Sequence, residues 1–368
     1  MDFPIHSDAV EYLSSMDPAL GRLMNLSGPV HRGIEPDPFT ALASAIVAQQ
    51  LSASAADTIW ARFQTLAGSV TPERISVLSE ADMRACGLSF QKIGYIRNIA
   101  DAFLSVHLSD ALFNTANDEQ ITQALTAVKG IGRWTAEMFL IFCLGRADVF
   151  SYGDLGLRKG MGWLRGLPGE PAPELAKAVS ALWSPYASTA SLYLWEVTLR
   201  GLYKQAPAQA LYPEFAGISG ETGTMDSPIG PLKIVSSPLG LTEVSLCASA
   251  AHVTCSCPLI AETKKQLDAY FRGTRRVFDL PLAPGGDDAN RVVWAALRTV
   301  SFGERTDAKS LANRAGKSFT AQTVSAANKK SRLLILVPSH RLVRADGRAV
   351  DSVQQWLLSH EAATSVSG

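Results

Sequence analysis

Cysteine, net charge and long apolar runs are all scarce in this chain of 368 residues. The five cysteines are too few and too scattered for the disulfide framework of a secreted scaffold. The N-terminal stretch MDFPIHSDAVEYL contains acidic residues and no long apolar run, which argues against a secretory signal and against a membrane span. We therefore expect a cytoplasmic protein that has no membrane partner.

The one cysteine cluster is HVTCSC, in which His252, Cys255 and Cys257 offer three metal ligands. A structural zinc site needs four ligands, and the neighbouring sequence supplies no clear fourth. A half-buried strand and turn explains the segment better, so no metal site is predicted.

The formal net charge is zero, but the charges are unevenly distributed along the chain. The segment 291–348 contains 12 Lys and Arg against 3 acids, a net charge of +9 that the other 310 residues balance. A basic segment on an otherwise acidic protein is typical of a polyanion binder. A solvated charged face is the alternative interpretation.

The hydrophobic pattern predicts a multidomain chain. From Asp8 to about Leu202, apolar residues recur at spacings of three and four, which predicts an all-α domain. After a linker rich in Ala, Pro and Gly, a strand hairpin around Gly240 and several amphipathic helices predict an α+β domain that ends in a helix-turn-helix. The predicted boundaries are 1–203 for the helical domain, 204–223 for the linker, 224–284 for a small α/β subdomain and 285–368 for the helix-turn-helix subdomain.

The segment LTAVKGIGRWTAEMFL places two glycines at a turn between two predicted helices, with Thr135 as the predicted cap of the second. Because glycine lacks a Cβ, backbone N–H groups there can approach a phosphate closely, at the positive end of the following helix. We predict a sequence-independent anchor for the DNA backbone. Its residues are Lys129, Gly130, Gly132, Arg133 and Thr135.

Five segments in order resemble the helix-hairpin-helix DNA glycosylases, specifically the 3-methyladenine DNA glycosylase II type. They are IVAQQLSASAA, GLSFQKIGYI, VKGIGRWTAEMFLIF, LGRADVFSYGDLGLRKG and WSPYASTASLYLW, which lie between roughly residues 10 and 200. The resemblance implies base excision repair of double-stranded DNA that contains alkylated bases, by a monomer. It implies no cofactor, apart from a monovalent cation that the carbonyl groups of Val128 to Gly130 would hold.

The resemblance places Asp154 where the family keeps its catalytic aspartate. Cleaving the bond between base and deoxyribose builds positive charge on the sugar, which a fixed carboxylate stabilises while it orients the attacking water. Trp134 stands where lyase-competent relatives carry a Schiff-base lysine, so a monofunctional glycosylase is expected. For Trp134, stacking on a flipped base and ordinary core packing both stay open, and Tyr152 is a second candidate for the base pocket.

Base flipping leaves a gap in the duplex, which family members fill from the loop that matches AQQLS. The candidate wedge is Gln49, Gln50 or Leu51, and a simple helix C-cap is the alternative. Two positions depart from the family pattern: Gly153 replaces a second acid, and Ala187 replaces an arginine. If these changes reflect functional decay, the chain is a non-catalytic binder of damaged DNA.

From about Thr224 to Glu361 the chain resembles the methylated-DNA-protein-cysteine methyltransferases. The matching segments are SPIGPLKIVSSPLGL, QLDAYFRGTRRVFDLPL, VVWAALRTVSFGE and ILVPSHRLVRADG. That family transfers an alkyl group from guanine to the cysteine of Pro-Cys-His-Arg. Ser339 occupies the cysteine position, with His340 and Glu361 where the family has its base and the acid that orients it. A serine hydroxyl ionises far less readily than a thiol, so we predict that alkyl transfer is absent.

Other family features change together with the cysteine. Asp307-Ala308 replaces the Ser-Tyr pair that pushes out the base, Gln322 replaces the arginine finger, Ser331-Arg332 replaces Asn-Pro, and the loop that closes the pocket is missing. We therefore predict a degenerate alkyl-acceptor site on a module that still binds DNA. Residual alkyl transfer at Ser339 or Cys255 and a purely structural module stay open. The predicted DNA-binding residues of this module are Arg314, Lys317, Gln322, Lys329, Lys330 and Arg341.

Overall fold

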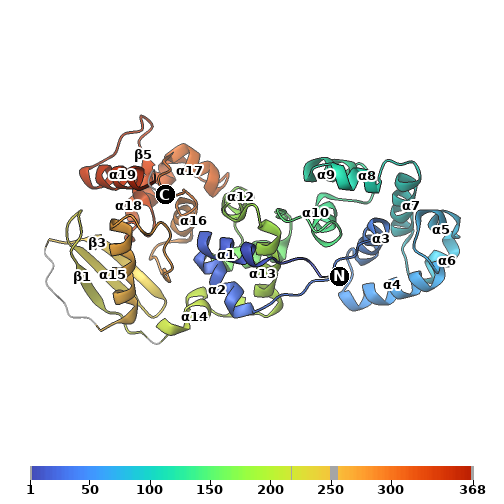
Figure 1. Ribbon diagram of the computed structural model, residues 1–368, viewed down its shortest axis with the longest axis horizontal. Coiled ribbons are helices and arrows are strands. Elements are labelled where there is room, and N and C mark those ends of the chain that lie inside the picture. The colour runs from blue at the N-terminus through green and yellow to red at the C-terminus, as the bar shows by residue number, and fades with distance from the viewer. Residues whose placement is uncertain (1, 217, 249–255, 366–368) are drawn as a thin grey trace. The chain divides into compact units, whose positions relative to one another are not determined.

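The protein folds into two compact units in a computed structural model that describes residues 2–216, 218–248 and 256–365 (Figure 1). The first unit comprises Met1–Ile5 and Val30–Asp154, and the second comprises His6–Pro29 and Leu155–Gly368. His252 and Cys255 lie outside the described residues, so the strand and turn expected there stay a prediction.

The first unit is helical. Polar side chains at the helix starts set its boundaries: Asp37, Ser52, Ser89 and Asn117 each accept a hydrogen bond from a backbone N–H of the first turn that follows. The buried isoleucines of α7 recur at the spacing that lines one helix face. The helices are α3 (Pro38–Ala48), α4 (Ala53–Ala67), α5 (Pro72–Val77), α6 (Glu80–Ala85), α7 (Phe90–Leu104), α8 (Asp110–Thr115), α9 (Asp118–Thr126) and α10 (Arg133–Phe142).

The second unit begins with a helical group that includes both N-terminal helices of the chain. Asp17 caps α2, and its buried carboxylate also accepts hydrogen bonds from Arg165 and Trp183, which joins segments far apart in the sequence. Helices α11 and α13 pack against each other, and α13 also contacts α2. The group consists of α1 (Ser7–Met16), α2 (Pro18–Ser27), α11 (Leu155–Leu164), α12 (Pro173–Ser180) and α13 (Ala187–Leu199).

The segment predicted as a linker is folded against α2 over part of its length. It contains α14 (Pro207–Leu211), whose Leu211 is buried together with Tyr212. Arg22 of α2 donates to the Leu211 carbonyl at 3.0 Å, and its guanidinium lies 4.1 Å from the centre of the Tyr212 ring. A segment with these buried contacts acts as a fixed connector rather than as a flexible coil.

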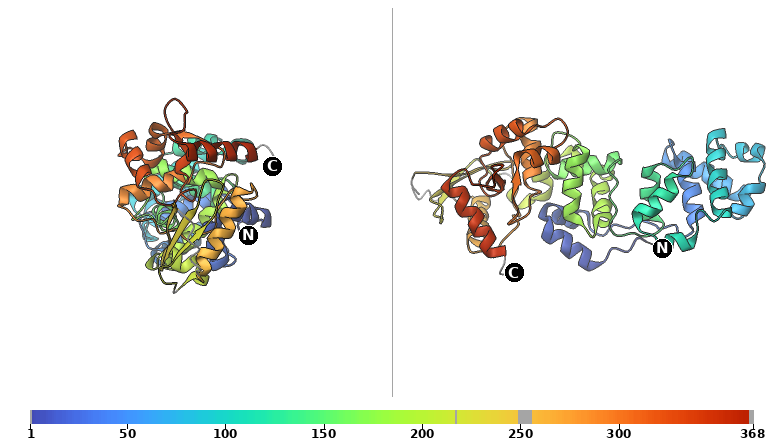
Figure 2. Two further views of the ribbon diagram at one scale, coloured as in Figure 1. Left: turned by 90° about the vertical axis from the view of Figure 1, so that its left-hand side faces the viewer. Right: turned by 90° about the horizontal axis from the view of Figure 1, so that it is seen from above.

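The predicted strand hairpin is present. The antiparallel sheet has the order β1 (Thr222–Met225), β2 (Leu232–Ser237) and β3 (Gly240–Leu246). Gly240 adopts a φ of 124°, and a Cβ there would lie 2.4 Å from the Pro281 carbonyl oxygen, so the turn requires glycine. Helix α15 (Pro258–Phe271) contacts β1 and β2 and lies against one face of this sheet (Figure 2).

The three helices predicted for the C-terminal part are also present. They are α16 (Asp288–Leu297), α17 (Ala308–Ala315) and α18 (Ala321–Lys330), and they pack against one another in the helix-turn-helix arrangement. A 3-10 turn at Ser339–Arg341 leads directly into β5 (Leu342–Val343), which pairs in parallel with β4 (Thr306–Asp307), and α19 (Ser352–Ser365) follows. The predicted fold class, an all-α part followed by an α+β part, is confirmed.

Candidate functional site

The hairpin between α9 and α10 is braced by side chains from α7 and from the end of α3. Gly130 adopts a φ of 114°, and a Cβ there would lie 2.4 Å from Cγ of Tyr95. Asn98 Nδ2 donates to the Lys129 carbonyl at 3.0 Å, and Gln49 Nε2 donates to the Gly130 carbonyl at 3.2 Å. The backbone of the hairpin is therefore held in one conformation.

The carbonyl groups considered for a monovalent cation each accept one hydrogen bond within the protein. The Val128 carbonyl accepts from the N–H of Ile131 at 3.1 Å, and those of Lys129 and Gly130 accept from Asn98 and Gln49. A carbonyl oxygen has two lone pairs, so one per oxygen stays available for a cation. Cation binding here stays a prediction.

Helix α10 begins at Arg133, with Gly132 as its N-cap and no side chain that caps its first turn. The prediction that Thr135 caps this helix is wrong, because Thr135 is the third residue of the helix and is buried. Backbone N–H groups at an uncapped helix start attract anions. Lys129 and Arg133 are exposed beside them, and Arg133 pairs with Glu137 at 2.9 Å.

Asp154 lies at the end of the first unit, next to the start of α10. Its Oδ2 accepts a hydrogen bond from Trp134 Nε1 at 2.8 Å. The Trp134 side chain is 45% exposed, so the core-packing interpretation of this residue is wrong. Asp154 is half-buried. The site therefore presents a carboxylate that solvent can reach and that an indole N–H holds in place.

The segment that precedes Asp154 is fixed by a second set of contacts. Ser151 Oγ donates to Glu137 at 2.5 Å, with both residues buried, and the N–H of Asp154 donates to the Ser151 carbonyl at 3.1 Å. Tyr152 is half-buried, with its ring centre 5.2 Å from that of Phe150. These contacts position Asp154, while a role for Tyr152 in a base pocket stays a prediction.

The three wedge candidates differ in their surroundings. Gln49 follows the last residue of α3. Its side chain donates a hydrogen bond to the hairpin at Gly130, so it is not free to enter a DNA duplex. Gln50 is exposed with a φ of 58°, and Leu51 is 39% exposed. An exposed apolar residue beside a strained turn is the arrangement that a wedge requires, so Leu51 is favoured.

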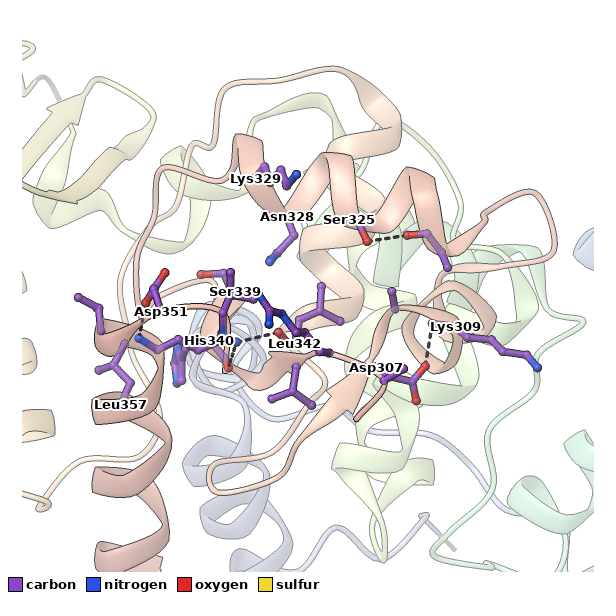
Figure 3. A pocket seen from close by; sticks show the side chains of 18 of the residues that line it. Asp307, Lys309, Ser325, Asn328, Lys329, Ser339, His340, Leu342, Asp351 and Leu357 are labelled. Atoms are coloured by element: carbon purple, nitrogen blue, oxygen red, sulfur yellow. Dashed lines mark hydrogen bonds between the residues drawn. The ribbon is translucent and has the colours of Figure 1, made fainter. Parts of the chain in front are cut away.

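A cavity of about 580 Å³ surrounds Ser339 and His340 in the second unit (Figure 3). Asn328 from α18 faces them across the cavity. Asp307 also lines it, but its carboxylate is occupied as the cap of α17, accepting from the N–H groups of Lys309 and Ser310. Two buried acceptors, Asn328 Oδ1 and His340 Nδ1, have no hydrogen-bond partner in the described part of the chain.

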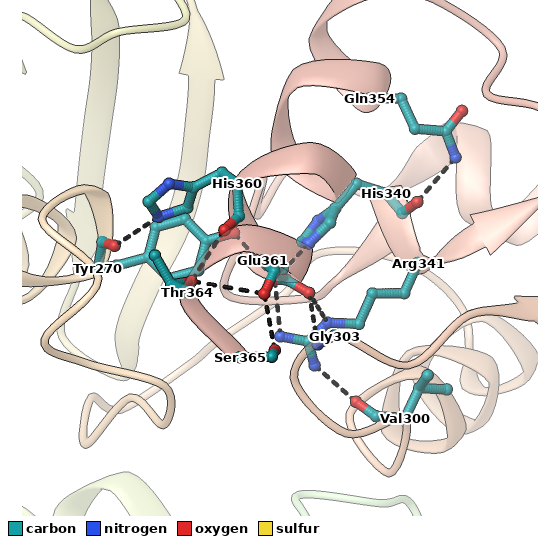
Figure 4. Close-up of polar contacts among 10 residues, drawn as sticks. All are labelled: Tyr270, Val300, Gly303, His340, Arg341, Gln354, His360, Glu361, Thr364 and Ser365. Carbon is teal, nitrogen blue, oxygen red and sulfur yellow. Dashed lines mark hydrogen bonds and ion pairs between the residues drawn. The ribbon is translucent and has the colours of Figure 1, made fainter. Parts of the chain in front are cut away.

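Glu361 is fully buried at the centre of a polar network that includes His340 (Figure 4). Its carboxylate accepts from His340 Nε2 at 2.7 Å, from Tyr270 at 2.9 Å and from the Gly303 N–H at 3.0 Å. Arg341 donates to both of its oxygens at 3.0 Å. The structure thus brings His340 and Glu361 together, as the sequence predicted, and places the guanidinium of Arg341 beside them.

The prediction that Arg341 binds DNA is wrong. Arg341 is 7% exposed, and its donors are occupied by Glu361 and by the Val300 carbonyl at 2.5 Å, so its side chain cannot reach a phosphate. Arg314 is half-buried and pairs with Glu304 at 2.9 Å. The remaining predicted residues are exposed: Lys317, Gln322, Lys329 and Lys330.

Within ranges 2–216, 218–248 and 256–365, no group of three or more His, Cys, Asp or Glu side chains is arranged to hold a metal ion. Among the same residues, no helix combines the length and the apolarity needed to cross a membrane.

Three family models match the chain in succession. Residues 43–185 match the HhH-GPD superfamily of base excision DNA repair proteins. Residues 222–284 match the ribonuclease-like domain of 6-O-methylguanine DNA methyltransferase, and residues 288–363 match its DNA binding domain.

Individual relatives agree with these models. DNA-3-methyladenine glycosylase 1 of Schizosaccharomyces pombe is 36% identical over 195 residues, which are 51% of this chain and 85% of that protein. The methylated-DNA–protein-cysteine methyltransferase of Methanosarcina barkeri is 32% identical over 130 residues, 34% of this chain and 82% of that protein. The crystal structure of a DNA-3-methyladenine glycosidase from Bacillus halodurans matches 56% of this chain and 97% of its own, at 36% identity and a TM-score of 0.51.

The chain belongs to the HhH-GPD glycosylases. Its C-terminal part consists of the two domains of a 6-O-methylguanine DNA methyltransferase. This fusion was predicted from the sequence and is confirmed. Ala187, which replaces a family arginine, is buried in the first turn of α13.

Sequence reasoning assigned no role to two residues that shape the glycosylase hairpin, Tyr95 and Asn98. Both lie within or next to the segment GLSFQKIGYI, which carried the family resemblance. Their spacing of three places them on one face of α7, beside Gln91, which donates to the Tyr95 hydroxyl at 2.6 Å. That spacing was a signal that one helix face contacts a neighbouring element.

The buried network predicts that the methyltransferase-like domains lose stability in acid. Burial lowers the pKa of His340 below its usual 6.5, and the hydrogen bonds from His340 and Arg341 hold the pKa of Glu361 well below 4.5. The unfolded chain therefore binds more protons than the folded one, first below about pH 6.5 at His340 and then below about pH 4.5 at Glu361. Stability contributed by both groups is lost as the pH falls.

Thermal unfolding followed from about pH 8 to about pH 5 should show a melting temperature that declines below pH 6.5. The decline should be smaller in His340→Gln, which removes the group that titrates first. A decline of the same size in this variant would contradict the assignment to His340.

Proposed function

We propose that the protein is a monofunctional DNA glycosylase that excises alkylated bases of the 3-methyladenine type from double-stranded DNA, acting as a monomer. The observation that supports this most directly is the half-buried Asp154 carboxylate, held by Trp134 at 2.8 Å beside the uncapped start of α10. The names of the glycosylase relatives support the substrate class.

The chemistry requires a fixed anion next to the sugar. As the bond between C1′ and the base nitrogen breaks, the electron pair leaves with the base and the sugar becomes cationic. Asp154 stabilises that cation and accepts a proton from the water that attacks C1′. An alkylated purine already carries positive charge, so it leaves as a neutral base without protonation by an enzyme acid.

The hairpin anchors the DNA backbone during this reaction. The N–H groups at the start of α10 and the exposed Lys129 and Arg133 offer donors and positive charge to phosphate groups. Leu51 would fill the gap left by the extruded base. These contacts do not read base sequence, which suits an enzyme that searches all DNA for damage.

The test is release of 3-methyladenine from methylated duplex DNA by the purified protein. Free base should accumulate while the DNA strands remain intact until alkali is added, because no lysine stands at position 134. Strand cleavage without alkali, or a protein–DNA adduct after borohydride reduction, would contradict the monofunctional assignment. Tight binding to an abasic analogue without base release would indicate a damage binder instead.

The variant Trp134→Phe distinguishes two roles of Trp134: orienting the Asp154 carboxylate and stacking on a flipped base. The phenyl ring keeps an aromatic face but removes the N–H that donates to Asp154. Loss of a hydrogen bond to a charged group should lower the single-turnover rate by roughly tenfold or more, with little change in DNA affinity. An unchanged rate would show that the indole N–H does not position Asp154.

For the methyltransferase-like part, we propose DNA binding without alkyl transfer. The exposed lysines at 317, 329 and 330 support binding, and the cavity beside Ser339 contains no thiol among its described lining residues. Incubation with duplex DNA containing O6-methylguanine, followed by intact-protein mass spectrometry, should show no added methyl group. A methyl adduct on Ser339 or on any cysteine, Cys255 included, would contradict this.

A further inference from the structure

Two adjoining cavities in the second unit have strongly basic walls. They measure about 320 Å³ and about 330 Å³, and both are lined by Arg165, Tyr212 and Arg298. Arg291 lines the first cavity and Arg276 lines the second. Against these four arginines, the described lining residues include one acid, Asp17, while Asp288, which lies outside the lining, pairs with Arg291 at 3.0 Å. This excess of positive charge belongs neither to the glycosylase site nor to the Ser339 cavity.

Asp17 has no hydrogen-bond acceptor position left for a second arginine. Arg165 donates to both of its oxygens, at 2.5 Å and 3.3 Å. Trp183 Nε1 donates to it at 2.8 Å, and the N–H of Leu20 at 3.4 Å. A carboxylate offers about four acceptor positions, and these bonds use them. The acid is therefore committed to the helical group in which it lies.

Arg298 is the arginine without a partner. It is half-buried at the end of α16, and its guanidinium has no hydrogen bond or ion pair with any residue in the described part of the chain. Burial, and then the nearby Arg165, lower the pKa of Arg298, while the charge of Asp17 and the nearby Tyr212 raise it in part. Arg165 also keeps one buried donor, Nε, that meets no acceptor among the described residues. The unmet buried donor of Arg165 is costly unless an acceptor satisfies it, whereas the half-buried guanidinium of Arg298 keeps donors for a ligand in the cavities.

We propose that these adjoining cavities bind a small phosphate-bearing anion, held by the guanidinium of Arg298 beside the side chain of Arg165. Guanidinium groups match the oxygens of a phosphate in pairs, which makes arginine the preferred residue for such recognition. The apolar walls, which include Leu280 and Leu282, suit a phosphate monoester with an organic part better than a bare ion.

The bound anion would connect two parts of the second unit. Arg165 belongs to the segment after α11 of the glycosylase half, whereas Arg298 belongs to α16 of the methyltransferase-like half. A phosphate that binds both would stabilise their junction, next to the existing ion pair of Arg22 with Asp279 at 2.7 Å. This ligand site is separate from the residues that carry out base excision.

The experiment measures anion binding to the full-length chain. Melting temperature and isothermal titration would be recorded with inorganic phosphate, with deoxyadenosine 5′-monophosphate and with sodium chloride at matched ionic strength. We expect both phosphates to bind and to raise the melting temperature more than chloride does. Arg298→Gln should weaken phosphate binding by about tenfold or more, because it removes a charged, paired contact. Arg272→Gln is the matched control, since Arg272 is exposed and lines neither cavity.

Equal phosphate responses in the wild type, Arg298→Gln and Arg272→Gln would overturn the proposal. So would an Arg298→Gln variant that is more stable than the wild type in every buffer, because Arg298 would then be only an unpaired charge. If the nucleotide bound no more tightly than inorganic phosphate, the assignment to an organic monoester would be wrong. Should Arg298→Gln fail to fold, Arg298→Lys and phosphorus NMR line broadening with the wild type test the same contact.

Discussion

Asp154→Asn is expected to lower the rate of 3-methyladenine release by roughly 100-fold to 10,000-fold while duplex DNA still binds. The amide has the size of the carboxylate and can still accept the Trp134 N–H, so the local structure should survive. What it loses is the negative charge that faces the cationic sugar and the basicity that removes a proton from water. Single-turnover release of base from methylated duplex DNA measures the effect directly.

Asp148→Asn is a suitable control for this variant. Asp148 is an exposed acid in the same loop, so the substitution makes the same change of charge away from the Trp134 contact. Its rate should match that of the wild type. Base release that persists in Asp154→Asn, or that falls equally in both variants, would show that Asp154 is not the group that stabilises the transition state.

The positions of the residues in the two candidate sites were predictable from the sequence because each lies in a motif. Asp154 follows the hairpin segment by about one helix, and Ser339-His340 lies in the strand and turn that match the methyltransferase pattern. The contacts that orient them were not predictable. Trp134 and Asp154 are 20 positions apart, and neither composition nor periodicity indicates that the indole N–H points at the carboxylate.

In the C-terminal part, the number of basic residues along the sequence was a poor predictor of which side chains can bind DNA. Arg341 was counted as surface charge because it lies in a basic segment, but Glu361 binds it from α19, 20 positions later. A pattern along the chain shows how many cations a segment has, but it does not show which of them are paired in the interior. Arg298 was counted in that same basic segment, and only the fold shows that Asp17 is already occupied.

The glycosylase helices and the methyltransferase-like domains are also joined by more contacts than the sequence predicts. The composition of the Ala- and Pro-rich stretch predicts a linker, because it breaks the helical period. In the structure, Leu211 and Tyr212 are buried and Arg22 holds both α14 and Asp279. The methyltransferase-like domains are thus packed against the glycosylase helices α1, α2 and α11 to α13 as one unit. Changes that destabilise these domains should therefore affect the glycosylase.

Glu361→Gln is expected to destabilise the second unit by roughly 3–5 kcal/mol. Glu361 is fully buried, and the substitution leaves the buried cation Arg341 without its counter-charge. Urea unfolding monitored by tryptophan fluorescence would report the loss. Glu304→Gln is the matched control: its ion pair with Arg314 is partly exposed, so it should cost less than about 1 kcal/mol.

A second substitution distinguishes loss of charge balance from loss of shape. Replacing Glu361 and Arg341 together, as Glu361→Gln with Arg341→Met, removes the uncompensated cation while it keeps most of the buried volume. Because the cost of the single variant comes mainly from an unpaired buried charge, the double variant should recover a large part of the lost stability. Additive losses in the double variant would mean that Arg341 contributes through packing on Phe302 and the Val300 carbonyl rather than through Glu361.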